Sequence, residues 1–288
     1  MSFVQSLQNN PALFIAVVAL MSLMIGSFLN AVIHRMPKII ERQWRAEVAE
    51  ASGQPLPDET AYNLMVPRSA CPSCNRQITA LQNIPVVSYL LLRGRCASCG
   101  IRISPRYPII ETLTAALSGY VAWRFGFTGQ TLAALIFVWA MIALAFIDLD
   151  TFYLPDDITL PLIWAGLLCN IPGTFTDLPS AVIGAAAGYA ILWGVFWLFK
   201  LVTGKEGMGY GDFKLFAALG AWFGWQALVP IILLASVTGA VVGLAMKLGG
   251  KLREGGYLPF GPFLAASGLS ALIFGPQAIL RLIGLPIA

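Results

Sequence analysis

The sequence predicts an all-α polytopic membrane protein with about eight transmembrane helices and a small cytoplasmic domain between the first and second of them. Of its 288 residues, 58% are hydrophobic and only 11% are charged, and the mean hydropathy is +0.76. Soluble globular proteins usually contain about 45–50% apolar and about 25% charged residues. Ten of the 18 Lys and Arg lie between Arg35 and Arg106, where they mark one polar segment. This composition excludes both a soluble fold and a disordered chain.

The first predicted transmembrane helix covers residues 11–33, an uncharged run of 23 residues that is long enough to cross about 30 Å of hydrocarbon. No Lys, Arg, Asp or Glu precedes Arg35. The basic region of a cleaved signal peptide is therefore missing, and we expect this helix to be retained. Basic residues follow the helix directly, beginning with Arg35 and Lys38. By the positive-inside rule, they place this end in the cytoplasm and the N-terminus in the periplasm.

Seven further spans are predicted, with boundaries near 108–125, 129–147, 157–171, 179–199, 212–225, 226–246 and 258–284. With the N-terminus outside, the cytoplasmic segments are 34–107, 148–156, 200–214 and 247–257. These segments hold 16 of the 18 Lys and Arg, and only Arg124 and Arg281 fall elsewhere. This distribution agrees with the positive-inside rule for eight helices.

Small residues punctuate the fifth of these eight spans, at Gly184, Gly188 and Gly194. In lipid, helices associate through close packing, and small residues let their backbones approach. We therefore predict that these glycines serve helix packing.

Two cysteine pairs lie in the polar segment, Cys71-Pro-Ser-Cys74 and Cys96-Ala-Ser-Cys99, with 21 residues between them. Two C-x2-C pairs at such a distance supply four thiolates for tetrahedral zinc. Two disulfides, four free thiols or a thiol oxidoreductase centre are the alternatives, and a cytoplasmic location disfavours disulfides. Four cysteines leave no open coordination position, so we expect a structural zinc that stabilises a domain with few large hydrophobic residues.

Acidic residues inside or beside predicted spans form the second candidate site, since an ionisable group at membrane depth is costly and is a functional candidate by default. Six acids qualify: Glu111, Asp148, Asp150, Asp156, Asp157 and Asp212. Asp148 ends the third predicted span, and Asp212 opens the sixth. Both are therefore expected at the cytoplasmic edge of the bilayer.

Two neighbouring carboxyl groups can share one proton, so that the charged one activates water while the neutral one donates to a substrate carbonyl. Gly209 and Gly211 lack side chains and would let a substrate backbone approach Asp212. The alternative is that such acids cap helices. We expect helix capping or exposure to water for Asp150, Asp156 and Asp157. For Asp148 and Asp212 the spacing leaves both catalysis and capping open.

Several motifs together resemble those of the bacterial type IV prepilin peptidases, which are membrane aspartyl proteases of the G-x-G-D kind. They are Gly26-Ser-Phe-Leu-Asn30-Ala-Val-Ile-His34-Arg35, the two cysteine pairs, Arg106-Tyr-Pro with Glu111, Asp148 with Pro155, and Gly209-Tyr-Gly211-Asp212. The two aspartates are 64 residues apart, and the motifs occur in the family's order.

The resemblance implies that the protein cleaves the short basic leader from prepilins and type II secretion pseudopilins at the cytoplasmic face of the inner membrane. It also implies N-methylation of the new N-terminus with S-adenosylmethionine. By position, Asp148 and Asp212 match the catalytic pair, and Asp150 does not. The cysteine-bearing domain at 34–107, absent from shorter relatives, is the expected methyltransferase part, and 108–288 is the expected seven-helix peptidase domain.

The expected partners are prepilin and pseudopilin substrates and the lipid bilayer, with no nucleic acid. The residues that bind S-adenosylmethionine are not predicted, because no glycine-rich nucleotide loop occurs in 34–107. Two alternatives in function stay open at this point, a peptidase without methylase activity and a membrane transporter. A transporter would place its acids near the bilayer midplane in broken helices.

Overall fold

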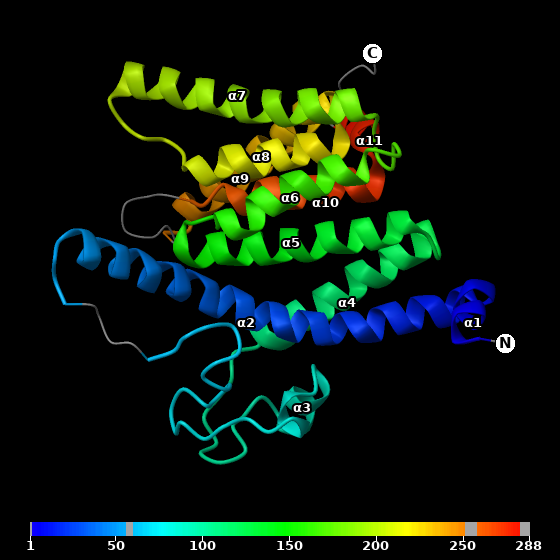
Figure 1. Ribbon diagram of the computed structural model, residues 1–288, viewed down its shortest axis with the longest axis vertical. Helices are drawn as coiled ribbons and strands as arrows, with labels where there is room; N and C mark the ends of the chain where they lie inside the picture. Colours follow the sequence, from blue (N-terminus) through cyan, green and yellow to red (C-terminus); the bar gives the residue numbers. More distant parts are fainter. Residues whose placement is uncertain (1, 56–59, 251–257, 283–288) are drawn as a thin grey trace. The chain divides into compact units, whose positions relative to one another are not determined.

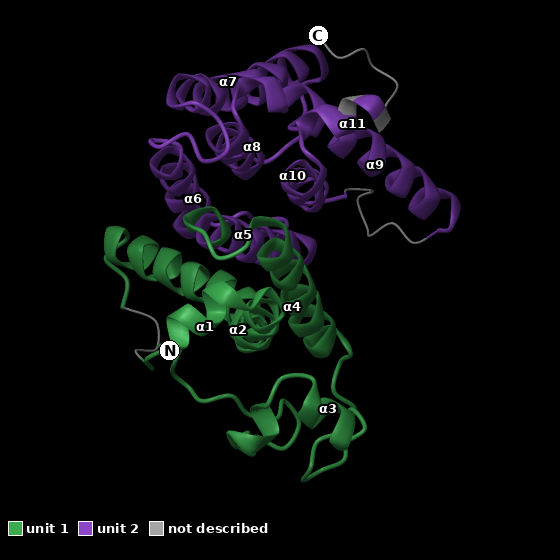
Figure 2. Cartoon of the chain, turned by 90° about the vertical axis from the view of Figure 1, so that its right-hand side faces the viewer, with its two compact units in different colours: residues 1–131 green, residues 132–288 purple. Residues whose placement is uncertain are grey.

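The computed structural model describes residues 2–55, 60–250 and 258–282. Within these ranges the regular structure is helical, apart from two isolated β-bridges (Figure 1). Internal packing divides the chain into two compact units, Met1–Thr131 and Leu132–Ala288 (Figure 2). The functional boundary expected between residues 107 and 108 is a different division and stays a prediction.

Four segments of the described chain are long and apolar enough to cross a membrane: α2 (Pro11–Ala51), α5 (Gly129–Thr151), α7 (Leu178–Thr203) and Trp225–Leu248, which joins η2 (Trp225–Ala227) to α9 (Leu228–Leu248). An all-helical, multi-pass membrane protein is thereby confirmed. The predicted count of eight spans is not reached by length and hydropathy.

The other predicted spans fall short for two physical reasons. Helices α6 (Asp156–Cys169), α8 (Tyr210–Phe223) and α10 (Gly261–Phe274) have 14 residues each, which corresponds to about 21 Å at 1.5 Å per residue. Helix α4 (Arg106–Phe125) is long enough but less apolar, since it contains Glu111 and has an arginine at or near each end.

The first unit contains α1 (Phe3–Asn9), α2, η1 (Leu81–Asn83), α3 (Val87–Leu91) and α4. Helix α2 begins where the Asn10 side chain accepts the Leu13 N–H at 3.0 Å. It continues past the predicted end at residue 33 and past Pro37 to Ala51. Hydropathy locates the end of the apolar run, whereas the helix continues through the charged residues beyond it. Helix α4 packs along α2 (Figure 2).

The second unit is built around α8, which packs against α6, α7 and α10. From Asp212 to Phe223 every residue except Lys214 is buried. A Cβ atom added to Gly220 would lie 2.1 Å from the Gly184 carbonyl oxygen, and one added to Gly188 would lie 2.7 Å from that of Phe216. The predicted packing role is confirmed for Gly184 and Gly188.

Two of the sequence predictions for this unit are corrected. Gly194 has no atom within 4 Å of an added Cβ, so it does not mediate close packing. The span predicted at 258–284 is two helices, α10 and α11 (Pro276–Leu282), because Gly275 adopts a positive φ of 84° between them. Residues 251–257 of the predicted cytoplasmic loop and 283–284 of that span lie outside the described residues.

Candidate active site and zinc site

Asp148 lies in the last full turn of α5. The chain leaves the helix at Phe152, which has a positive φ of 56° and donates its N–H to the Asp148 carbonyl oxygen at 2.9 Å. The Asp148 side chain is only 5% exposed, and its Oδ2 accepts the Gly261 N–H at 2.9 Å. Because Gly261 is the first residue of α10, the partial positive charge at that helix's N-terminus faces the carboxylate.

Asp212 lies in the first turn of α8 and is 6% exposed. Its Oδ2 accepts the N–H of Gly209, the N-cap residue, at 3.3 Å. Its Oδ1 is buried and has no hydrogen-bond partner among the described residues. Since buried polar atoms are nearly always paired, this oxygen marks a place for a proton, a water molecule or a substrate group. One oxygen thus caps the helix, and the other has no partner among the described residues.

Leu154 brings the two aspartates to one site. This buried side chain lies in the loop between α5 and α6 and contacts two glycines. A Cβ atom added to Gly211 would lie 2.7 Å from Leu154 Cβ, and one added to Gly261 would lie 3.2 Å from Leu154 Cδ1. The residue beside Asp212 and the residue bonded to Asp148 therefore pack on the same leucine.

The two glycines of the G-x-G-D motif differ in their surroundings. Leu154 fills the space that a side chain at Gly211 would need. An added Cβ at Gly209 would meet nothing closer than Asp212 Oδ2 at 3.8 Å. Gly211 is thus required for packing, whereas a side chain at Gly209 would meet no close neighbour among the described residues. Substrate approach over either glycine stays a prediction.

The two candidate acids on α6 stabilise local structure. Asp156 and Asp157 lie in the first turn of that helix, where its dipole favours negative charge. Asp156 also accepts two hydrogen bonds from Lys214 Nζ, at 2.6 and 2.7 Å. This ion pair joins the start of α6 to the first turn of α8, two residues beyond Asp212. Asp156 therefore positions the loop that carries Leu154.

Sequence reasoning missed Gly261, Leu154 and the Asp156–Lys214 ion pair. The Gly261-Pro262 dipeptide is a recognisable helix start, and Leu154 stands directly before Pro155. Neither signal indicates which distant residue is contacted, so the sequence alone could not connect them to the aspartates.

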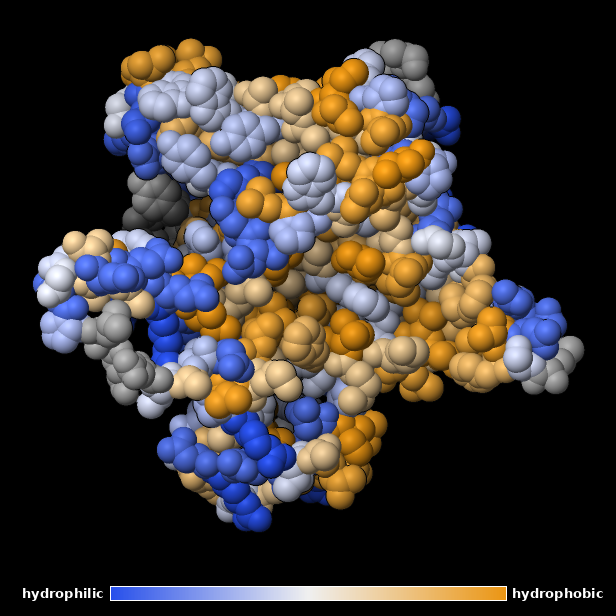
Figure 3. Space-filling view, in the orientation of Figure 1, coloured by the Kyte–Doolittle hydropathy of each residue, from blue (hydrophilic) through white to orange (hydrophobic). Residues whose placement is uncertain are grey.

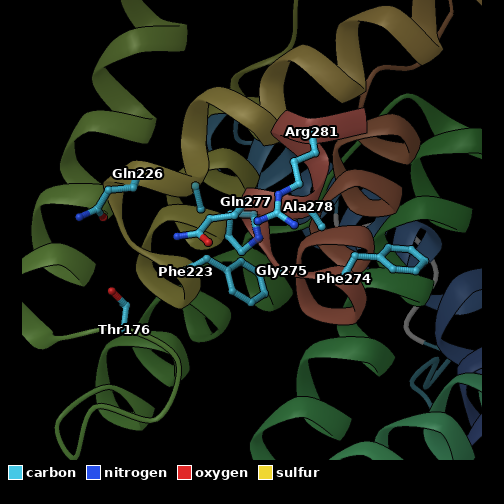
Figure 4. Close-up of a pocket in the computed structure, with 10 residues that line it drawn as sticks. Thr176, Phe223, Gln226, Phe274, Gly275, Gln277, Ala278 and Arg281 are labelled. Carbon is cyan, nitrogen blue, oxygen red and sulfur yellow. The ribbon is translucent and has the colours of Figure 1, made fainter. Parts of the chain in front are cut away.

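A cavity of about 530 Å³ lies in the same unit but away from the aspartates (Figure 4). Its lining includes Phe223, at the opposite end of α8 from Asp212, together with Gln226, Gln277 and Arg281. Phe223 lies eleven positions beyond Asp212 along the helix, which corresponds to about 16 Å. Among the described residues no acid lines this cavity, so they provide no carboxyl pair there.

The four cysteines of the polar segment form one cluster, in which all Sγ atoms lie within 4.8 Å of one another. The Cys71 and Cys99 Sγ atoms are 3.7 Å apart. With Zn–S bonds of about 2.3 Å, a tetrahedron requires sulfur atoms about 3.8 Å apart. The cluster therefore has the dimensions of a tetrahedral zinc site. It consists of the same four cysteines that the sequence spacing predicted.

The two cysteine pairs repeat one local structure. The N–H of Cys71 donates to the Arg76 carbonyl at 3.0 Å, and that of Cys96 donates to the Ile101 carbonyl at 2.9 Å. Backbone N–H groups of Cys99 and Ser98 lower the pKa of the Cys96 thiol to about 6. A thiolate is the form that binds metal, so the Cys96 sulfur is favoured as a metal ligand. The other three thiols crowd the Cys99 thiol, and burial together with these neighbours raises its pKa to about 11.

Polar residues of α2 and α4 make the hydrogen bonds that attach the polar segment to these two helices. Asn30 Nδ2 donates to the Tyr107 carbonyl at 3.1 Å, and Arg35 Nη1 donates to the Asn63 carbonyl at 3.1 Å. Glu111 Oε2 accepts the Val86 N–H at 2.7 Å. Asn30, Arg35 and Glu111 are all buried. These motif residues therefore hold the structure of the first unit together.

Comparison with known proteins gives matches along most of the chain. Residues 20–125 match the family described as "Bacterial Peptidase A24 N-terminal domain", and residues 135–244 match the "Type IV leader peptidase family". A "Prepilin leader peptidase/N-methyltransferase" of Pseudomonas aeruginosa is 52% identical over 96% of each chain. A protein of that name from Aeromonas salmonicida is 55% identical over 92% of each chain. Another from Burkholderia pseudomallei is 51% identical over 94% of this chain and 88% of its own. No solved structure matches.

Proposed function

The chain belongs to the type IV leader peptidase family, and we propose that it cleaves the leader from prepilins and type II secretion pseudopilins and then N-methylates the new N-terminus. The family resemblance stated from the sequence is confirmed by relatives that are more than 50% identical over most of the chain. These relatives carry both activities in their names, which favours the bifunctional enzyme over a peptidase without methylase activity.

Asp148 and Asp212 are proposed as the catalytic pair. The carboxylate without a proton accepts one from water as the water oxygen attacks the scissile carbonyl carbon, and the protonated partner donates to the carbonyl oxygen. Return of a proton to the leaving amine then breaks the C–N bond, and no covalent enzyme intermediate forms. The observation that carries this assignment is that Gly211, beside Asp212, and Gly261, hydrogen-bonded to Asp148, pack on the same leucine. Both carboxyl groups are buried, and Asp212 Oδ1 has no hydrogen-bond partner among the described residues.

Both aspartates lie at helix ends, where water for the hydrolysis can reach them. Asp148 ends a long apolar helix and Asp212 begins another buried helix, so both carboxyl groups would lie where water meets the bilayer. A transporter would need its acids at broken helices near the midplane. The placement of these aspartates supports the peptidase.

The test is leader cleavage by purified protein with a prepilin substrate. Asp148→Asn and Asp212→Asn should each lose at least 10³-fold in kcat/KM, because one carboxyl group cannot act as acid and base together. Asp150→Asn and Asp157→Asn are matched controls, and both should retain most activity. If Asp150→Asn loses leader cleavage while Asp148→Asn retains it, the assignment is wrong.

The polar domain is proposed to hold one structural zinc ion and to carry the methyltransferase function. Cys71, Cys74, Cys96 and Cys99 would bind the ion, and the cluster's dimensions fit it. Zinc supplies a cross-link between the two cysteine turns, and S-adenosylmethionine supplies the methyl group. The chain's own contribution is to fasten the segments that flank these turns to α2 and α4, through the hydrogen bonds of Arg35 with Asn63 and of Glu111 with Val86.

The proposed location is the bacterial inner membrane, with a periplasmic N-terminus, eight membrane segments and a cytoplasmic active site. The four short or less apolar helices α4, α6, α8 and α10 complete the eight, with α10 and α11 acting as one segment. Support comes from the charge distribution, since 16 of 18 Lys and Arg then lie in cytoplasmic segments. Reporter fusions after each segment would test this topology.

A further inference from the structure

The polar domain contains an uncharged segment that neither zinc binding nor the peptidase mechanism uses. No Asp, Glu, Lys or Arg occurs in the 16 residues from Gln77 to Leu92, and Arg76 and Arg93 flank them directly. This segment joins the two cysteine turns and contains η1 and α3. Its length is too short to span a bilayer but long enough to enter one leaflet.

Five large apolar side chains of this segment are exposed. Leu81 is 76% exposed, Leu90 is 68% exposed and Leu91 is 78% exposed, and Ile84 and Val87 are also exposed. Figure 3 shows hydrophobic side chains gathered on the side of the polar domain where Figure 1 places α3. Contiguous exposed apolar residues of this kind indicate a binding surface for a protein or a membrane.

The depth of the segment follows from its attachment to α4. The Val86 N–H, at the start of α3, donates to Glu111 Oε2 at 2.7 Å. Glu111 in turn packs against Gly26 of α2, where an added Cβ would lie only 2.7 Å from Glu111 Cα. Gly26 lies seven residues inside the uncharged run that ends at Ile33, which is about 10 Å along the helix. Val86 is therefore held near the level at which α2 is already within the bilayer.

The charge of the surrounding domain fits an anionic surface. Residues 60–107 contain six arginines and no Asp or Glu. A zinc ion with four thiolates would contribute −2, which leaves a net charge of about +4 on this part of the domain. Arg93, Arg95 and Arg102 are exposed, and arginines beside an apolar surface are attracted to the anionic lipids of the cytoplasmic leaflet.

We propose that residues 77–92 form a membrane-docking surface: Leu81, Leu90 and Leu91 enter the cytoplasmic leaflet beside α2 and α4, and the flanking arginines bind anionic lipid headgroups. The buried Glu111 is then a positioning residue that fixes α3 at this depth through Val86. The polar domain would thus lie on the membrane surface and not above it in the cytoplasm.

The experiment places the photoreactive residue p-benzoylphenylalanine at Leu91 of the full-length protein, in vesicles of phosphatidylethanolamine and phosphatidylglycerol at three to one. Ala97, exposed in the second cysteine turn, is the matched control position. After irradiation, mass spectrometry should find lipid adducts at position 91 with at least tenfold the yield at position 97. Phosphatidylglycerol should exceed its one-quarter share among those adducts. Zinc content and leader cleavage report folding of each variant.

Three results would overturn the proposal. The first is an equal lipid yield at positions 91 and 97, and the second is no enrichment of phosphatidylglycerol. The third is adducts with added prepilin in place of lipid, which would make this surface a substrate site. If the Leu91 variant does not fold, the same label at Leu81 makes the same prediction with the same outcomes.

Discussion

Replacing Gly261 by alanine should separate catalysis from folding. The added Cβ would lie 2.6 Å from Asp148 Oδ2, whereas ordinary van der Waals contact begins at about 3.4 Å. Relief therefore requires a displacement of about 0.8 Å. The three nearest atoms all belong to side chains, two to Asp148 and one to Leu154, so the Asp148 carboxylate moves and the backbone stays in place.

A displacement of this size in a reacting group costs on the order of 10²-fold in rate. This factor corresponds to about 2.7 kcal/mol of transition-state stabilisation. We expect kcat/KM for leader cleavage to fall by that factor in Gly261→Ala. The thermal unfolding temperature in detergent should change by less than the experimental scatter between preparations, since no backbone contact is broken.

Gly239→Ala is the matched control. Gly239 lies on α9 and faces Phe263 of α10, but an added Cβ there would be 3.5 Å from the nearest atom, which is ordinary contact. It should cleave at the wild-type rate. Wild-type cleavage by Gly261→Ala, or an equal loss in both variants, would refute the role assigned to the Gly261–Asp148 contact.

Three further predictions concern other parts of the molecule. Purified protein should contain one zinc per chain by elemental analysis, and Cys71→Ser should lose it and make the polar domain protease-sensitive; active enzyme without zinc contradicts this. Gly220→Ala should lower the free energy of unfolding by about 3 kcal/mol, because the added Cβ meets the Gly184 backbone, whereas Gly194→Ala should be neutral or stabilising in the same melting assay. Asp212→Ala should still methylate a pre-cleaved pilin with a free N-terminus when S-adenosylmethionine is present; loss of methylation in every folded dyad variant would indicate one shared site.

The sequence alone determined the features that depend on local pattern. Uncharged runs identified the membrane helices, because each must cover its own backbone and face lipid with apolar side chains. The spacing of Cys71, Cys74, Cys96 and Cys99 predicted their cluster, since each pair needs only a short turn to present two thiolates. Asp148 and Asp212 were candidates because acids are costly at membrane depth.

The number of spans was less predictable, because the length and hydropathy that a helix needs depend on whether lipid or neighbouring protein covers it. Helix α8 is short, yet it is almost wholly buried by neighbouring protein. Glu111 and two arginines lower the hydropathy of α4, although Glu111 is buried beside α2. Length and composition therefore describe a helix poorly where protein, and not lipid, covers it.

Only the tertiary structure decided how the aspartates meet and which residues hold them. Leu154, Gly261 and the Asp156–Lys214 ion pair are each distant in sequence from a residue that they contact. Their contacts depend on how α5, α8 and α10 pack, and packing is a property of three-dimensional shape that no periodicity records. The chemistry of the site can thus be inferred from residue types, whereas its geometry exists only once the helices have packed.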